Sequence, residues 1–283
     1  ENLQHPGLIW SGYLRMLKSS AILYLIPART DSRNRKRIDM KGVVLAGGLG
    51  TRLRPLTSIT NKHLLPVYDQ PMIFYPIQKL AEAGIKDVML VTGGDSAGDF
   101  LRLLGDGSKF GLNTLNYAYQ VSEGGIAEAI GLTRTFVGGD KFVVILGDNI
   151  LEDSLASKVE SFGNQKEGAR ILLKTVDNPS DYGVAELDGT RVISIEEKPK
   201  SPRSSYAVIG VYMYDSYVFE IIDSLEPSAR GELEVTDINN AYLNLNKLHA
   251  QIIEGWWADS GCSIDGLLQA GIMARQLRRG DPV

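Results

Sequence analysis

Cysteine is almost absent from this chain, which has Cys262 alone among its 283 residues. A disulfide within the chain is impossible, and zinc sites built from several cysteines are excluded. Long apolar runs are missing as well, because the stretch Ala21 to Pro27 is far shorter than the roughly 20 residues of a transmembrane helix. These absences fit a reducing cytosol, and we expect a cytoplasmic protein without a membrane segment.

An excess of basic residues is also lacking. The formal net charge is −4, and residues 1–39 hold 7 Lys and Arg against 3 Asp and Glu, so the rest of the chain has a net charge of −8. Extended nucleic-acid binding requires many phosphate contacts from Lys and Arg, and the composition argues against it. A polyanion bound by this protein must therefore meet positive charge that is concentrated locally.

Residues 1–39 differ from the following sequence in their composition and in their pattern of apolar and basic residues. They combine the short apolar stretch with a basic run, Arg33 to Arg37, and a strand pattern begins directly after Met40. A signal peptide would need a longer apolar region and a cleavage site, whereas the basic run could be a targeting or nucleic-acid patch. We interpret the segment as an N-terminal extension outside the main fold, and we expect residues 40–283 to form one α/β unit.

Strands and helices alternate from Met40 onward. Short apolar runs bounded by turn residues predict strands, and longer segments with helical periodicity predict helices. The expected strands are residues 41–46, 87–92, 114–119, 141–146, 170–176, 182–187, 191–196 and 207–214, and the expected helices are residues 71–83, 95–104, 125–136, 216–224, 235–246 and 264–279. This order predicts a parallel sheet with helices on both faces, which binds ligands beyond the carboxyl ends of its strands.

A glycine-rich segment, LAGGLGTRLRP, follows the first strand. Its glycines let the backbone approach an anion closely, and its hydroxyl and guanidinium groups are donors suited to phosphate oxygens. The residues concerned are Gly47, Gly48, Gly50, Thr51 and Arg52. The spacing matches neither the Walker A loop nor the dinucleotide-binding fingerprint. On these residues alone, an ordinary tight connection between a strand and a helix is an equally good interpretation.

Longer stretches resemble the family of sugar-1-phosphate nucleotidyltransferases. The similarity opens with GGLGTRLRPLT and NKHLLPVYDQPMIFYPI and continues in order, at family-like spacing, to about Arg279. Further matching stretches are YQVSEGGIAEAI, ILGDNI, DYGVAEL, EEKP, SSYAVIGVYMYD, ARGELEVTDINNAYL and WWADSG. Within the family, the members that join dTTP to glucose 1-phosphate are the most similar.

The resemblance implies both a fold and a reaction. The fold would be a Rossmann-like, three-layer α/β/α arrangement with a mixed, mostly parallel sheet and an added sugar-binding β subregion. In the reaction, an oxygen of the sugar phosphate would attack the α-phosphorus of dTTP in line, giving dTDP-glucose and pyrophosphate. Such a transfer needs a metal and positive charge around the transferring phosphorus, but no covalent nucleophile.

Each part of this reaction has a matching position in the sequence. The resemblance makes Arg52, Lys62 and Lys198 the catalytic residues, with the first two on the triphosphate and the third on the sugar phosphate. The nucleotide-binding residues would be Leu45, Gly47, Gly48, Gly50, Thr51, Gln120 and Gly125, the last two at the base. Gly183, Glu197 and Val208 would bind the sugar. Asp148 and Asp259 would hold Mg²⁺, a hard ion that prefers oxygen ligands.

Simpler interpretations of individual residues remain open. Asp148 follows a strand and could cap a helix, and Lys198 in a charged turn could be solvated surface. We interpret His63, beside Lys62, as a local hydrogen-bonding residue and not as a base, because the chemistry needs none. Glu232 is taken as a structural residue near a helix N-terminus.

Departures from the family pattern bear on specificity and regulation. Residues 122–124 (SEG) stand where thymidylyltransferases often have a proline and an aspartate before the glycine, so another nucleotide or another sugar 1-phosphate stays an alternative. A non-catalytic sugar-nucleotide-binding subunit would lack the metal carboxylates or the phosphate lysine, which this chain retains. The chain resembles the short form of the family, without the C-terminal helices of an allosteric site, and we expect a homo-oligomer.

Deletion of residues 1–39 should leave the transfer reaction intact, because every motif of the resemblance lies after them. Pyrophosphate release from dTTP and glucose 1-phosphate is measured for the full and the shortened chain at equal concentration. A large loss of turnover in the shortened chain would instead make the segment part of the fold.

Overall fold

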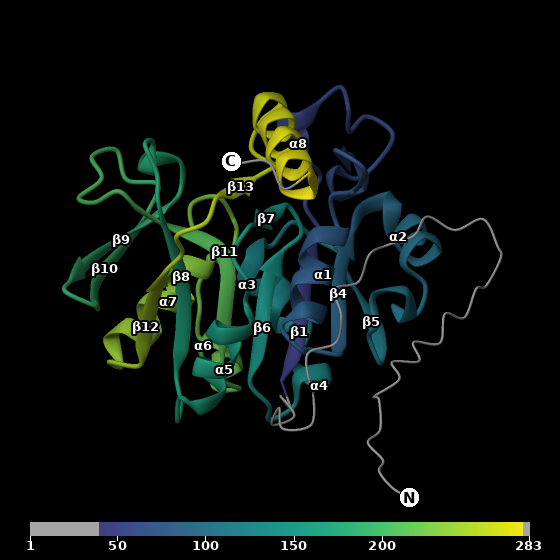
Figure 1. Ribbon diagram of the computed structural model, residues 1–283. Coiled ribbons are helices and arrows are strands. Elements are labelled where there is room, and N and C mark those ends of the chain that lie inside the picture. The colour runs from purple at the N-terminus through teal and green to yellow at the C-terminus, as the bar shows by residue number, and fades with distance from the viewer. Residues whose placement is uncertain (1–39, 280–283) are drawn as a thin grey trace, which may run out of the picture. The chain divides into compact units, whose positions relative to one another are not determined.

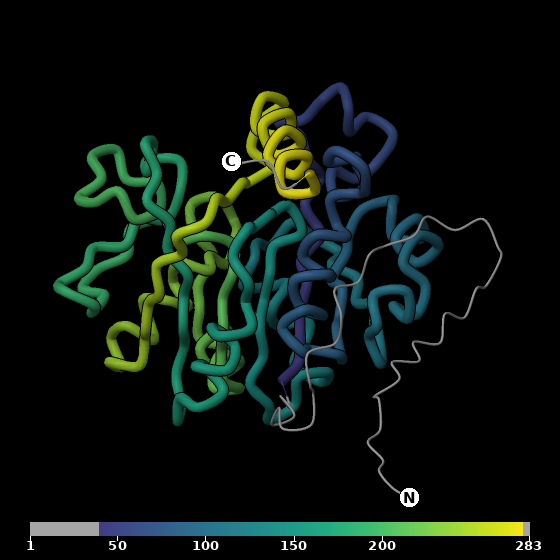
Figure 2. The backbone as a smooth tube through the Cα atoms, viewed as in Figure 1, coloured from purple at the N-terminus to yellow at the C-terminus, as the bar shows by residue number. Residues whose placement is uncertain are grey.

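The computed structural model describes residues 40–279, so the extension predicted for residues 1–39 lies outside the described residues. A mixed, nine-stranded sheet forms the centre of this region (Figures 1 and 2). Its strands are β1 (Lys41–Ala46), β4 (Asp87–Gly93), β5 (Thr114–Gln120), β6 (Phe142–Leu146), β8 (Ala169–Thr175), β9 (Gly183–Asp188), β10 (Arg191–Glu197), β11 (Tyr206–Tyr214) and β12 (Leu248–Ile252). Two short pairs lie outside it, β2 (Pro66–Val67) with β3 (Gln70–Pro71) and β7 (Asn149–Leu151) with β13 (Trp257–Asp259).

The direction of the strands confirms the sheet expected from the sequence. The order is β10-β9-β11-β6-β1-β4-β5, while β8 pairs with β11 and with β12. β1 runs parallel to β4 and β6, and β4 runs parallel to β5. Because β11 is antiparallel to β6, β8 and β9, the only strands of this sheet that run against the others are β10 and β11. The sheet is therefore mixed and mostly parallel.

Alternating residues of β1 show why helices cover both faces. Val44 and Ala46 pack in one apolar cluster with α1, α2 and α5, whereas Val43 and Leu45 pack in a second cluster with α3, α4, α6 and α7. Side chains of a strand alternate between faces, so an uninterrupted apolar run is buried from both sides. The helices are α1 (Phe74–Glu82), α2 (Ala97–Leu104), α3 (Gly125–Gly131), α4 (Arg134–Val137), α5 (Ala156–Asn164), α6 (Val218–Asp223), α7 (Val235–Asn244) and α8 (Ile264–Arg279).

The last helix lies at the edge of the sheet where β1 and β6 end. In Figure 1, α8 is the yellow helix above the sheet, and its Ala270 and Ala274 pack against Val67 and Trp256 in a small cluster of their own. Arg278 near its end donates to Gln70 Oε1 at 2.9 Å. Among the helices of residues 40–279, none is long and apolar enough to cross a bilayer.

Several elements differ from the sequence prediction. The helix expected over residues 125–136 is two helices, because the buried Thr133 interrupts it and bonds the carbonyl of Ile130 through its hydroxyl at 2.7 Å. The helix expected from residue 71 begins at Phe74, since Gln70 and Pro71 form β3. The prediction also lacked α5, β7 and β12, whose short or weakly patterned sequences become ordered by packing against distant segments.

An irregularity in β11 joins the sheet to the segment after β6. The register between β11 and β8 shifts between Val208 and Tyr212. Within this stretch the backbone N–H of Gly210 donates to Asn149 Oδ1 at 2.9 Å. A Cβ atom on Gly210 would lie 2.6 Å from Asn149 Nδ2 and 2.7 Å from Leu146 Cδ1, so the strand can approach β6 and β7 only with glycine here.

The substitution Gly210→Ala should lower the free energy of unfolding by about 1–3 kcal/mol, because the added methyl group overlaps buried atoms that cannot move freely. The matched control is Gly139→Ala, at a position where a Cβ atom would meet nothing within 4 Å. Both variants are compared with the parent by denaturant unfolding. Equal stability of the two variants would contradict the close approach at Gly210.

Candidate active site

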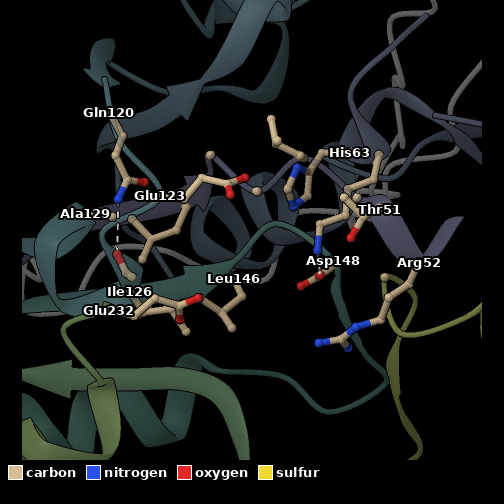
Figure 3. Close-up of a pocket in the computed structure, with 18 of the residues that line it drawn as sticks. Thr51, Arg52, His63, Gln120, Glu123, Ile126, Ala129, Leu146, Asp148 and Glu232 are labelled. Carbon is tan, nitrogen blue, oxygen red and sulfur yellow. Dashed lines mark hydrogen bonds and ion pairs between the residues drawn. The ribbon is translucent and has the colours of Figure 1, made fainter. Parts of the chain in front are cut away.

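A cavity of about 380 Å³ opens at the carboxyl ends of β1, β5 and β6. Its lining comes from the glycine-rich loop, the Lys62 turn, the end of β5, helix α3, the end of β6 and the segment after β13. In Figure 3, Gln120 lies at one end of the cavity and Arg52 and Asp148 lie at the other. The lining includes Leu45, Gly47, Gly48, Gly50, Thr51, Arg52, Lys62, Gln120, Gly125, Asp148 and Asp259. The cavity therefore brings together all the residues assigned from sequence to the nucleotide and the metal.

The glycines of the loop make room for two neighbouring side chains. Gly50 has a φ of 65°, a left-handed conformation that glycine adopts without cost. A Cβ atom there would lie 2.7 Å from Lys62 Cβ, and one on Gly47 would lie 2.7 Å from Gln120 Oε1. The loop can thus close over a lysine at one end and a carboxamide at the other.

Lys62 forms an ion pair with Asp148. The Nζ–Oδ2 distance is 2.5 Å, and both side chains are largely buried. Burial opposes the charge on each partner, but their mutual attraction outweighs it, so the pKa of Lys62 is raised and that of Asp148 is lowered. Asp148 lies between β6 and β7 and α5 begins only at Ala156, so the interpretation of Asp148 as a helix cap is wrong.

His63 lies next to this pair and makes the local hydrogen bonds expected from the sequence, and it also lines the cavity. It is almost fully buried, and its Nδ1 lies 2.7 Å from Asn61 Oδ1, which also accepts from the backbone N–H of His63 at 3.0 Å. Burial and then the charge of Lys62 lower the pKa of His63 to about 3. The ring is therefore neutral and fixed in place.

A second carboxylate reaches Asp148 through the pairing of β7 with β13. Asp259 stands opposite Asn149 in this pair, and both the N–H and the hydroxyl of Ser260 donate to the Asp148 carbonyl. Burial and then the negative charge of Asp148 raise the pKa of Asp259 to about 6. Two repelling carboxylates of this kind are suited to a divalent cation. Within residues 40–279 there is no cluster of three His, Cys, Asp or Glu side chains that could hold a metal, so further ligands must come from substrate or water.

The residues assigned to the sugar form a separate group beside the cavity. A Cβ atom on Gly183 would lie 3.3 Å from Glu197 Oε2 and 3.8 Å from Val208 Cβ, so these three adjoin one another. Thr236 donates to Glu197 Oε2 at 2.6 Å. Lys198 is half-exposed, with its Nζ 3.9 Å from Glu197 Oε1. None of the four sequence-assigned residues lines the cavity.

Aromatic side chains connect this group to the carboxylates. The pKa of the buried Tyr212 is raised by burial and then by the charges of Glu197, Asp148 and Asp259, so one hydroxyl lies within electrostatic reach of all three. The Tyr182 carbonyl accepts from the N–H of Lys198 at 3.0 Å, and its ring packs edge-on against Trp257 at 5.2 Å. The sugar group therefore lies near the acidic pair.

Several cavity-lining residues were not assigned to the site from the sequence, among them Glu123, Ile126, Leu146 and Glu232, and neither were Asn149 and Glu128, which bond residues of the lining. Glu232, interpreted as a structural residue near a helix N-terminus, also lines the cavity. The buried Asn149 accepts from Trp257 Nε1 at 2.7 Å and donates to Asp148 Oδ1 at 3.1 Å. Glu128 accepts from Gln120 Nε2 at 2.6 Å. One feature of the sequence could have pointed to Asn149: it is a polar residue directly after Asp148, the carboxylate that follows the buried strand β6.

Comparisons with known proteins agree with this geometry. A family model described as nucleotidyl transferase matches residues 41–274. A glucose-1-phosphate thymidylyltransferase of Mycolicibacterium smegmatis is 45% identical over 247 residues, which cover 85% of either chain. A crystal structure described as a glucose-1-phosphate thymidylyltransferase from Bacillus anthracis, in complex with sucrose, is 52% identical, with a TM-score of 0.80 over 83% of this chain and 95% of that one. A UDP-glucose pyrophosphorylase, 24% identical with a TM-score of 0.74 over 84% and 98% of the two chains, shares the fold.

Members of the matched family use a divalent metal ion and act on nucleotide and sugar-phosphate substrates. The match spans nearly all the described residues, and the relatives cover this chain and their own lengths almost equally. The chain therefore belongs to the nucleotidyl transferase family.

Proposed function

We propose that this protein transfers a thymidylyl group from dTTP to glucose 1-phosphate, giving dTDP-glucose and pyrophosphate. The observation that supports this most directly is the composition of the cavity. One end holds Arg52 and Asp148, with Lys62 paired to Asp148, and the other holds the carboxamide of Gln120; Asp259 also lines the cavity. A nucleoside triphosphate has a matching polarity, with phosphates at one end and a base at the other. The names of the similar thymidylyltransferases support the choice of dTTP and glucose 1-phosphate.

The metal of the reaction would be Mg²⁺, held by Asp148 and Asp259. Their oxygens are hard ligands, and a cation between them would offset both the burial of the Asp259 charge and its repulsion by Asp148, which together raise the pKa of Asp259. When bound, Mg²⁺ supplies charge neutralisation at the phosphate oxygens. Asn149 would orient Asp148 by its bond to Oδ1, because a fixed carboxylate keeps its lone pairs aimed at one place.

Lysine and arginine side chains would carry the electrostatic part of the transfer. Arg52 is exposed at the cavity and would bind the departing pyrophosphate. Lys62, held by its ion pair, would place a fixed positive charge beside the α-phosphate. Charge that is oriented before reaction stabilises the transition state without a cost of reorganisation. Reactant positioning and this charge together account for the chemistry, with no covalent intermediate.

The attacking substrate would lie in the group around Glu197. Glu197 and the backbone near Gly183 would bind sugar hydroxyls, Val208 would contact the ring, and Lys198 would hold the phosphate whose oxygen attacks. The positive φ of 45° at Lys198 is a rare backbone conformation for a non-glycine residue, often found where a side chain is aimed by its surroundings. By resemblance to the family, we expect the enzyme to act as a homo-oligomer in the cytoplasm.

The reaction is tested by incubating the protein with Mg²⁺, glucose 1-phosphate and each of five triphosphates in turn, namely dTTP, UTP, CTP, GTP and ATP. Pyrophosphate release should be fastest with dTTP, because the base end of the cavity would then be matched to thymine. Release with none of the five would rule out the transfer for this sugar. A clear preference for another base would keep the reaction and change the nucleotide.

The substitutions Asp148→Asn and Asp259→Asn should each lower turnover at least about a hundredfold. Each removes a carboxylate that would hold the metal at the reacting phosphate. Both should also weaken the binding of Mn²⁺, used as a spectroscopic probe in place of Mg²⁺. The control is Asp99→Asn, an exposed aspartate on α2 that pairs with Arg102. Circular dichroism and the thermal midpoint establish that each variant is folded. Near-normal turnover or Mn²⁺ binding in either variant would show that the metal lies elsewhere.

A further inference from the structure

The carboxamide of Gln120 is held in one orientation. Its Nε2 donates to the Gly125 carbonyl at 3.1 Å and to Glu128 Oε2 at 2.6 Å. Carbonyl and carboxylate oxygens only accept hydrogen bonds, so the NH₂ group must face them and use both of its hydrogens there. The other atom of the carboxamide, Oε1, is therefore left for the opposite side.

The free oxygen faces the nucleotide end of the cavity. Gln120 Oε1 lies beside Gly47, so close that a Cβ atom on Gly47 would be only 2.7 Å from it. Both residues line the cavity. A bound molecule at this end thus meets an acceptor and no donor from the Gln120 side chain. A group with an N–H aimed at Gln120 would be bound, and a group with a lone pair aimed there would be repelled.

Glu128 is fixed more firmly than an ordinary surface glutamate. Besides Gln120, it accepts from the Ser122 hydroxyl at 2.7 Å and from the Gly124 N–H at 3.2 Å. Burial alone would raise the pKa of Glu128, but these hydrogen bonds outweigh burial and lower it, so the carboxylate is ionised. A Cβ atom on Gly124 would lie 2.4 Å from the carboxyl carbon of Glu128, which shows how closely the loop wraps this group.

We propose that Glu128 is a positioning residue for base selection, which keeps the carbonyl oxygen of Gln120 toward the base and so favours pyrimidines that carry an N3–H. Thymine and uracil have this N–H next to a carbonyl, whereas cytosine has a lone pair at N3 and an amino group beside it. The proposal rests on the function above, since it names the group that selects the base of the same nucleotide. Glu128 does not line the cavity, so its effect on the base would pass through Gln120, which does.

The sharpest comparison uses dUTP and dCTP, because these two differ only at the base edge that would face Gln120. The ratio of kcat/KM for dUTP to that for dCTP is measured with glucose 1-phosphate and Mg²⁺. Removal of the carboxylate in Glu128→Ala leaves only the Gly125 carbonyl to hold the NH₂ group, so the carboxamide can turn this group toward the base and the ratio should fall at least about tenfold. The ratio of dTTP to dUTP should stay unchanged, because the methyl group does not involve this contact.

A second variant displaces the carboxylate without removing it. Gly124 has a φ of −73°, which alanine adopts easily, and the methyl group of Gly124→Ala would occupy the space of the Glu128 carboxyl group. This variant should lower the dUTP to dCTP ratio in the same direction. The control is Glu160→Ala, which removes an exposed glutamate from α5 and should leave the ratio as it is.

A double-mutant cycle separates positioning from a general structural role. In the Gln120→Ala background, the further change Glu128→Ala should alter the ratio by no more than about twofold, because its effect passes through the missing carboxamide. A uniform loss of turnover with all nucleotides at a constant ratio, or a parent enzyme that prefers dCTP, would overturn the proposal. If the parent releases no pyrophosphate at all, the proposed transfer fails, and the same ratio is then read from calorimetric binding of the two nucleotides with Mg²⁺.

Discussion

Lys62 and Asp148 come from segments far apart in the chain and meet in a largely buried ion pair. Removal of one partner from such a pair leaves an uncompensated charge and costs about 3–5 kcal/mol. Lys62 also fills the space beneath Gly50, and the Asp148 carbonyl is bound by Ser260. The glycine-rich loop, the end of β6 and the strand that carries Asp259 are thus attached to a single electrostatic contact, and the position of each depends on it.

The charges around this contact do not balance. One lysine faces two buried carboxylates. Its attraction keeps the pKa of Asp148 low, whereas burial and then the charge of Asp148 raise the pKa of Asp259 to about 6. The protein's own groups thus leave one buried negative charge without a full positive partner, as is common where a bound ligand supplies the missing charge. The cavity accordingly combines side chains that are fixed by the protein, such as the neutral His63, with one carboxylate, Asp259, that a bound cation would neutralise.

The sequence predicted the central strands and the lining of the cavity well, because both depend on local patterns or on the family motifs. The run KGVVLA in β1 is apolar throughout and is buried from both faces. By contrast, the contact of Asp259 with Asp148 depends on the pairing of β13 with β7, which no local pattern encodes. The role of Gly47 was predicted for an anion, yet its missing side chain also makes room for Gln120. That distinction depends on a long-range contact between the loop after β1 and the end of β5.

The segment between β8 and β11 has a simple boundary. Thr175 pairs with Tyr206, and the N–H of Val176 donates to the Ser205 carbonyl at 3.0 Å, so residues 176–205 leave the end of β8 and return to the start of β11 at one point. This excursion contains β9 and β10 and, with them, Gly183, Glu197 and Lys198. The pairing of β8 with β11 joins its two ends, so the length of the segment can change while β8 and β11 keep their register. Glu197 is bound by Thr236, and the Tyr182 ring packs against Trp257 near Asp259, so a change of acceptor sugar would require matched changes outside the segment.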